Sequence, residues 1–173
     1  MPFRPMHSKK CRSLRTARQV DTLYRAVREP YDWVCQPRLT GDRACLAVVD
    51  KKVYVQNQRG EWYSKRVNNV PAFLKMPNRT CLDGVVQDGT FYPFEALSVG
   101  GKMFLHTTAN EREVMAYHLM CLINQPWIFG APSKNWLLKR RDNMPRFSGV
   151  VLKRSSSVYE FAGHSDWVTH AWA

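Results

Sequence analysis

Residues 82–97 read LDGVVQDGTFYPFEAL, and this segment carries the strongest structural signal in the chain. Two apolar runs, Leu82 to Val86 and Phe91 to Leu97, flank Gln87-Asp88-Gly89. An Asp-Gly pair between two such runs is typical of a tight hairpin turn. The segment therefore predicts a pair of antiparallel strands joined at Asp88-Gly89.

The flanking sequence continues the β pattern from Trp33 onward. A second hairpin is predicted around the turn Asp50-Lys51-Lys52, and Gly100-Gly101 predicts a further turn. The strands expected in addition to the first pair are 45–49, 53–55, 102–106, 147–153 and about 167–172.

One long helix interrupts the strands. It is expected to open at Asn110 or Thr108, with Glu113 three residues after Asn110 as in a capping box, and to run to about Asn124. Because its apolar residues cover much of its circumference, we expect it to be well buried. Many short strands with two or three helices predict an α+β fold dominated by antiparallel sheet.

Size and composition favour one globular domain with a short appendage. The chain has 173 residues, of which 45% are hydrophobic and 12% aromatic, which is enough to fill a core. No apolar run approaches the roughly 18 residues that span a bilayer, and the first ten residues lack the apolar core of a secretory signal. Five scattered cysteines without C-x-x-C spacing argue against a disulfide framework and a zinc site, and suit a reducing cytosol. We therefore expect no metal site and no membrane partner.

Basic residues outnumber acidic ones by 26 to 14, which gives a formal net charge of +12 and a pI near 9.8. Residues 1–28 hold eight Lys or Arg and one acid, and Val20, Leu23, Tyr24 and Val27 form the apolar stripe of an amphipathic helix. We therefore divide the chain into a basic arm, residues 1–29, and a domain, residues 30–173. Such a charge attracts DNA or RNA by releasing counterions from phosphates; the alternative is a solvated surface that keeps the protein soluble.

Four segments, taken in order, bear on chemistry. QPRLTGDR (36–43) precedes a strand, and NQRG (57–60) follows a hairpin. LDGVV (82–86) leads to FEAL (94–97). The last segment, SGVVLKR (148–154), is followed by Ser157, Tyr159, Ser165, Asp166 and Trp167.

This order and spacing resembles the adenylation domain of ATP-dependent DNA ligases, and more broadly the covalent nucleotidyltransferases. The family's motifs read P-K-x-D-G-x-R, then R-x-G, then L-D-G-E with F-D-x-L, and finally E-G-V-V-x-K with W-x-K-x-K. The resemblance covers about residues 30–172 and implies a nucleotidyltransferase fold with mainly antiparallel sheets. In the family a lysine attacks the α-phosphorus of ATP, and the AMP then passes to a 5′-phosphate end. Such ligases add an OB-fold after the final motif, which we expect to be lacking because the chain stops at Ala173.

Several positions depart from the family's pattern. Arg38 stands at the position of the nucleophilic lysine, and a guanidinium stays protonated, so it cannot be that nucleophile. By resemblance, the family's carboxylates would orient ribose and hold a metal. Their positions here hold Thr40, Val85 and Ser148, and the two final lysine positions hold Thr169 and Ala171. The resemblance therefore implies a retained scaffold in which no catalytic residue can be assigned.

Residues that still match the family, together with Arg38, are the candidates to bind a nucleotide: Arg38, Gly41, Arg43, Asp83, Phe94 and Lys153. Most also have an ordinary structural explanation. Gly41 suits a turn, and Asp83 suits a turn or a cap. Phe94 can be a core aromatic, and Lys153 can point outward from an alternating strand.

A second group of residues is predicted to bind nucleic acid: Arg12, Arg15, Arg18, Arg59, Lys65, Arg66, Lys139, Arg140 and Arg141. Arg43 and Arg59 are favoured for contacts with a strand because phosphate recognition does not need the missing carboxylates. Trp62, near Arg59, is suited to stack on an exposed base. We therefore expect a catalytically degenerate, ligase-like domain that binds DNA or RNA as an accessory or inhibitory protein in replication, repair or nucleic-acid processing, without a cofactor.

Two alternatives stay open. An active minimal ligase or nucleotidyltransferase would use ATP and Mg²⁺, with a nucleophile elsewhere, such as Lys51, Lys52 or Lys65. A protein-interaction module would reuse the fold and dock its basic arm on an acidic partner or on ribosomal RNA. The expected location is the cytoplasm, or the nucleoid or host-cell cytoplasm if the source is a virus.

Overall fold

The computed structural model describes residues 33–128, 130, 145–159 and 167–171, so the predicted basic arm, residues 1–29, lies outside the described residues. Among the described residues, no helix combines the length and the apolar character needed to cross a membrane. The strands are β1 (Trp33–Leu39), β2 (Asp42–Val49), β3 (Lys52–Asn57), β4 (Thr80–Gln87), β5 (Thr90–Val99), β6 (Lys102–Met103), β7 (Phe147–Arg154) and β8 (Trp167–Ala171), and the helices are α2 (Val70–Phe73) and α3 (Ala109–Ile123).

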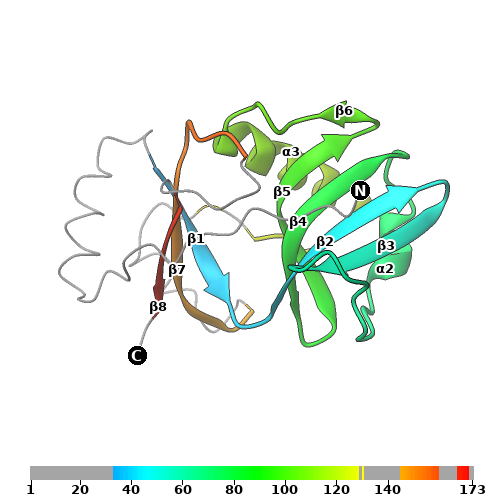
Figure 1. Cartoon of the computed structure of the whole chain (residues 1–173), viewed down its shortest axis with the longest axis horizontal. Coiled ribbons are helices and arrows are strands. Elements are labelled where there is room, and N and C mark those ends of the chain that lie inside the picture. The colour runs from blue at the N-terminus through cyan, green and yellow to red at the C-terminus, as the bar shows by residue number, and fades with distance from the viewer. Residues whose placement is uncertain (1–32, 129, 131–144, 160–166, 172–173) are drawn as a thin grey trace.

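The strands form two antiparallel sheets (Figure 1). One sheet has the order β1-β7-β8, and the other has the order β3-β2-β4-β5-β6. Both expected hairpins are confirmed: β2 pairs with β3 across Asp50-Lys51, and β4 pairs with β5 across Asp88-Gly89. All four turn residues have positive φ, as a type I′ hairpin turn requires. The prediction of an α+β fold with mainly antiparallel sheet is therefore confirmed.

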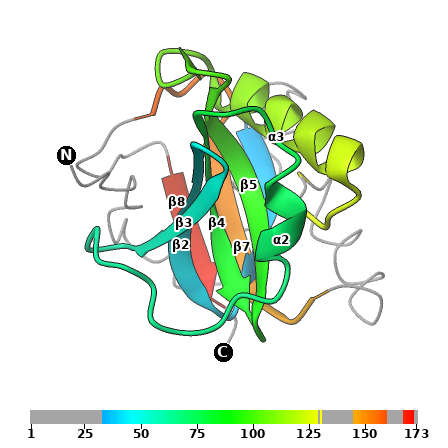
Figure 2. The same ribbon diagram turned by 90° about the vertical axis from the view of Figure 1, so that its right-hand side faces the viewer.

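The central strands of the five-stranded sheet, β2, β4 and β5, carry buried residues on both faces. Helices α2 and α3 lie together on one side of it (Figure 2), where Leu46 of β2 belongs to the larger apolar cluster. The next residue back along β2, Cys45, points the other way and joins a second cluster with Leu39 of β1 and Phe94 of β5. This second cluster fills the space between the two sheets, and most of the predicted nucleotide-binding residues lie around it.

Helix α3 begins after Thr108, one of the two predicted starts. The Thr108 hydroxyl accepts the backbone N–H of Glu111, whose carboxylate accepts the backbone N–H of Thr108 at 2.8 Å. The predicted capping box of Asn110 with Glu113 is therefore wrong. Asn110 is already within the helix, and the Glu113 carboxylate accepts the backbone N–H of Gly130 instead.

The buried side of α3 is a single stripe. Ala116, Leu119, Met120 and Ile123 follow one another at helical spacing and are at most 6% exposed. Leu122 is 72% exposed on the other side. The prediction that α3 is well buried is wrong for much of its circumference, because the sheet covers one side of the helix. The apolar or aromatic residues left exposed are Val114, Tyr117, Cys121 and Leu122.

The packing between β4 and β5 can be tested by substituting Gly84. The ladder shifts register between Asp83 and Gly84. A Cβ on Gly84 would lie 2.4 Å from the Tyr92 carbonyl oxygen and 2.7 Å from the Phe91 ring. We expect Gly84→Ala to lower the free energy of unfolding by about 2 kcal/mol in urea denaturation, as overpacked cores do. The control Lys75→Ala, at an exposed position, should change it by less than about 0.5 kcal/mol. An equally small change for Gly84→Ala would contradict this packing.

Candidate functional site

Two neighbouring strands place an arginine beside an aspartate in the space between the sheets. Arg43 of β2 donates from Nε to Oδ1 of Asp83 on β4 at 2.7 Å, and from Nη2 to Oδ2 at 2.5 Å. The Arg43 side chain is 15% exposed and that of Asp83 is fully buried. Burial alone would lower the pKa of Arg43, but the Asp83 carboxylate outweighs burial and leaves that pKa above its ordinary value. This bidentate geometry holds both side chains in one orientation.

An aromatic ring from β5 packs against this pair. The Phe94 ring centroid lies 4.7 Å from the Arg43 guanidinium carbon and 4.0 Å from Nζ of Lys153. Both distances are within the range of cation–π attraction. Tyr159, which follows β7, donates its hydroxyl to Asp83 Oδ2 at 2.7 Å. Four residues predicted to bind a nucleotide therefore meet between the sheets, where they contact one another.

A second buried network continues from Lys153 on β7. Its Nζ lies 3.4 Å from Oε1 of Glu95, and Nε of Arg112 on α3 donates to Oε2 at 3.3 Å. Arg112 also donates to the backbone carbonyls of Thr107 and Ser157. Burial lowers the pKa of Lys153 to about 8, and Glu95 opposes that shift. The alternative in which Lys153 points outward is wrong, because its side chain is 3% exposed.

Burial also controls the other titratable groups near these networks. It raises the pKa of the Cys45 thiol and of the Tyr159 hydroxyl well above their ordinary values, and that of Cys81 to about 12. It also raises the pKa of Glu113 to about 7, although Lys153 opposes this shift. Neither thiol is therefore a ready nucleophile at neutral pH, since the thiolate is the reactive form.

Two positions that depart from the family's pattern contact each other. Arg38 on β1 donates from Nη1 to Oγ of Ser148 on β7 at 3.1 Å. Thr40, a third such position, accepts at Oγ1 from Nε2 of Gln87 at 2.8 Å. Gln87 also donates to the Arg146 carbonyl at 2.6 Å and so links the two sheets. Arg38, Thr40 and Ser148 therefore make hydrogen bonds within the protein at positions where the family has a lysine and carboxylates.

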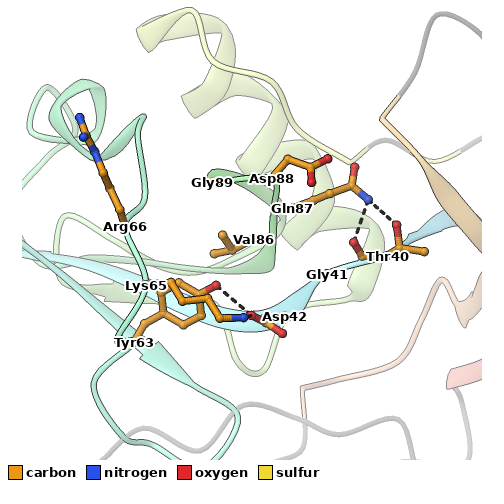
Figure 3. A pocket seen from close by; sticks show the side chains of 10 residues that line it. All are labelled: Thr40, Gly41, Asp42, Tyr63, Lys65, Arg66, Val86, Gln87, Asp88 and Gly89. Atoms are coloured by element: carbon orange, nitrogen blue, oxygen red, sulfur yellow. Dashed lines mark hydrogen bonds and ion pairs between the residues drawn. The ribbon is translucent and has the colours of Figure 1, made fainter.

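A cavity of about 310 Å³ opens where β2 begins and β4 ends (Figure 3). Gly41 lines it together with Lys65 and Arg66, which follow β3. Lys65 Nζ and the Tyr63 hydroxyl each donate to Oδ2 of Asp42 at 2.9 Å, and together they lower the pKa of Asp42. Arg66 is exposed and points away from this group of side chains (Figure 3). The structure therefore brings Gly41 close to two predicted nucleic-acid-binding residues.

The other predicted nucleic-acid-binding residues fall into two groups. Arg59 is exposed in the turn after β3. Arg12, Arg15, Arg18, Lys139, Arg140 and Arg141 lie outside the described residues.

Within the part of the chain that is described, no group of three or more His, Cys, Asp and Glu residues could hold a metal ion.

Sequence reasoning gave no role to Glu95, Arg112 or Tyr159. Arg112 carried a usable signal, because it lies four residues before Ala116 and so continues the stripe that α3 buries. A charge on a buried stripe needs a partner, and Glu95 supplies it. Tyr159 carried no such signal, since it meets Asp83 across 76 positions of sequence.

Comparison with known proteins shows the fold. No family model matches the chain, and no curated protein matches its sequence. The ligase domain of LigD from M. tuberculosis is similar with a TM-score of 0.66 and 16% identity, over 81% of this chain and 55% of that one. A mycobacterial DNA ligase D complexed with ATP and MES gives 0.57 and 17%, over 81% and 54%. A Lig E DNA ligase gives 0.52 and 13%, over 81% and 62%.

The chain therefore has the fold of ligase nucleotidyltransferase domains, as the sequence motifs implied. It spans a little over half the length of the ligase chains that it matches first. At this level of identity the likeness concerns the arrangement of the strands and helices.

The Arg43–Asp83 pair can be tested by substitution of its buried carboxylate. Asp83→Asn leaves the Arg43 charge uncompensated, so we expect a loss of about 3 kcal/mol in the free energy of unfolding. Tyr159→Phe removes one hydrogen bond to the carboxylate and should cost about 1.5 kcal/mol. Both values come from urea denaturation.

The matched control is Asp88→Asn. Asp88 also pairs with an arginine, Arg146, at 2.9 Å, but both side chains are mostly exposed. We expect this substitution to change the free energy of unfolding by less than about 1 kcal/mol. Equal losses for Asp83→Asn and Asp88→Asn would show that the buried pair is not a structural centre.

Proposed function

We propose that this domain uses the ligase fold to bind nucleic acid and does not transfer a nucleotide. The observation that carries the proposal is the set of mutual contacts among Arg43, Asp83, Phe94 and Lys153 between the sheets. A ligase of this fold has been solved with ATP, and covalent transfer in the family needs the nucleotide beside a reactive lysine. Here a nucleotide that entered the space between the sheets would have to break buried ion pairs. Removing one partner of such a pair costs about 3–5 kcal/mol, which opposes entry.

The residues at the family's chemical positions support the same proposal. Arg38 cannot lose its proton, and its guanidinium donates to Ser148. Val85 packs against the apolar cluster between the sheets. Of the lysines named as alternative nucleophiles, Lys65 is paired with Asp42, whereas Lys51 and Lys52 are exposed at the β2–β3 turn. Lys153 is buried beside Glu95.

Binding to a nucleic-acid backbone needs exposed cations and does not need these carboxylates. Arg59, Lys65 and Arg66 are exposed, and the chain carries a formal net charge of +12. The cavity that Lys65 and Arg66 line opens where β2 begins and β4 ends, and Arg43, Asp83 and Lys153 are not among the residues that line it. We therefore place the backbone contacts on this side of the domain. The Lig E ligases, which share this fold, are described as binding DNA with a minimal scaffold.

A domain that holds a strand without joining it would act as an accessory or an inhibitor in replication, repair or nucleic-acid processing. The alternative, a protein-interaction module, predicts a partner that stays bound after nuclease treatment of an extract. Gel filtration of that extract separates the two possibilities. Loss of all association after nuclease treatment supports nucleic-acid binding.

The absence of transfer chemistry is tested with α-labelled ATP or GTP and a divalent metal, followed by denaturing electrophoresis. We expect no labelled band for the wild-type protein. Arg38→Lys restores an amine at the family's position but leaves the buried pairs intact, so we expect no band there either. An active ligase on the same gel is the positive control.

The wild-type protein and Arg38→Lys together distinguish two ways in which the proposed absence of transfer could fail. A band with wild-type protein would mean that the domain is an active nucleotidyltransferase. A band with Arg38→Lys alone would mean that nucleotide enters freely and that only the nucleophile has been lost.

Binding through phosphates predicts a steep dependence on salt. Anisotropy titrations with a labelled oligonucleotide should give a linear fall of log K with log salt concentration. Arg66→Ala and Arg59→Ala should each reduce the slope by roughly one. Lys75→Ala, at an exposed position just after α2, is the control and should leave the slope unchanged. Absence of binding even at low salt would remove the proposed function.

A further inference from the structure

Two aromatic side chains lie exposed together at the edge of the five-stranded sheet. Trp62 is 65% exposed and Tyr54 is 37% exposed. Their ring centroids are 5.5 Å apart and their planes meet at 38°. Tryptophan is highly buried on average in proteins, so a tryptophan with two thirds of its surface in water calls for a partner.

The backbone fixes the position of Trp62. It forms an antiparallel bridge with Gln56 of β3. On either side of it, the Glu61 carbonyl accepts the Asn57 N–H at 2.8 Å, and the Tyr63 N–H donates to β3 at 2.9 Å. The Asn57 side chain also accepts the Glu61 N–H at 3.0 Å. The indole is therefore presented by a paired segment, which reduces the entropy that binding would cost.

Among the described residues, the aromatic pair is left exposed on the face that elsewhere packs against the second sheet. Tyr54 pairs with Ala47, two residues from Cys45, and Cys45 pairs with Asp83. Residues two apart on a strand share a face, so Tyr54 and the buried Asp83 project from the same side of the sheet. The β2–β3 hairpin points away from β1, β7 and β8 (Figure 1).

Positive charge borders the pair. Lys52 lies two residues before Tyr54 on the same face, and Arg59 is exposed in the turn that leads to Trp62. The nearby acid, Glu61, accepts a hydrogen bond from the Asn57 side chain at 2.9 Å. Exposed aromatic rings flanked by cations match an unpaired base with its phosphates, because a base within a duplex hides its faces.

We propose that Tyr54 and Trp62 form a stacking platform for an unpaired base of single-stranded nucleic acid. The inference rests on the proposed nucleic-acid binding and adds that strands with unpaired bases are preferred to duplexes. Stacking supplies this preference, whereas Arg59 and Lys52 supply contacts with phosphate that both kinds of strand can make.

The test compares anisotropy titrations of a labelled oligothymidine and a labelled duplex of the same length. Trp62→Ala should weaken binding of the single strand by roughly tenfold or more. It should change duplex binding by less than about twofold, because phosphate contacts dominate there. Trp62→Phe keeps a ring and should lose much less. Leu74→Ala, an exposed apolar residue after α2, is the control and should have no effect.

The outcomes distinguish this inference from the proposed function. If the wild-type protein binds both ligands but Trp62→Ala weakens neither, or weakens both equally, the platform is refuted and nucleic-acid binding stands. If the wild-type protein binds neither ligand at low salt, both proposals fail, and the exposed aromatics would belong to another kind of interface. Because Trp62 is mostly exposed, each variant should melt within a few degrees of wild type, which confirms that the comparison concerns binding.

Discussion

The buried ion pair between Arg43 and Asp83 constrains the positions of the side chains around it in the space between the two sheets. A carboxylate with no exposure to water needs a full set of partners, and Asp83 obtains them from Arg43 and Tyr159. Arg43 in turn rests against Phe94, which also contacts Lys153. Lys153 pairs with Glu95, which also pairs with Arg112, and all three side chains are buried. Each buried charge therefore contacts another member of the group, so removing one side chain leaves a neighbour without its partner.

This arrangement separates the interior charges from the exterior ones. Inside, each cation has a carboxylate beside it, and the aromatic ring of Phe94 lies under two of them. Outside, Arg59 and Arg66 are exposed, and Trp62 lies close to Arg59 in the sequence. Under the proposed function, the interior charges contribute to stability, whereas the exposed cations are the ones available for recognition. A ligase fold can divide its roles in this way because strand register, rather than chemistry, sets where each side chain lies.

Much of the fold could be predicted from local sequence, because each turn and helix start is determined by residues that are neighbours in the chain. Asp88-Gly89 and Asp50-Lys51-Lys52 marked both hairpins, and Thr108 was one of two predicted starts of α3. The capping partner was harder, since Glu111 and Glu113 each follow a polar residue by three positions. Local rules offer both pairs and cannot choose between them.

The candidate site was only partly predictable for a different reason. Motif resemblance brought Arg43, Asp83, Phe94 and Lys153 to attention, and the structure does bring these four together. It could not reveal that they bond to one another, because those contacts join residues far apart in the chain, such as Asp83 and Tyr159. The exposure of Trp62 likewise depends on which part of the sheet the second sheet leaves uncovered.

The most direct measurement is a crystal structure of the protein after soaking with ATP at millimolar concentration. The buried network predicts that Arg43 keeps both hydrogen bonds to Asp83 and that no base density lies against Phe94. An adenine stacked on the Phe94 ring, with Arg43 turned away from Asp83, would contradict the claim that the protein's own charges fill this site.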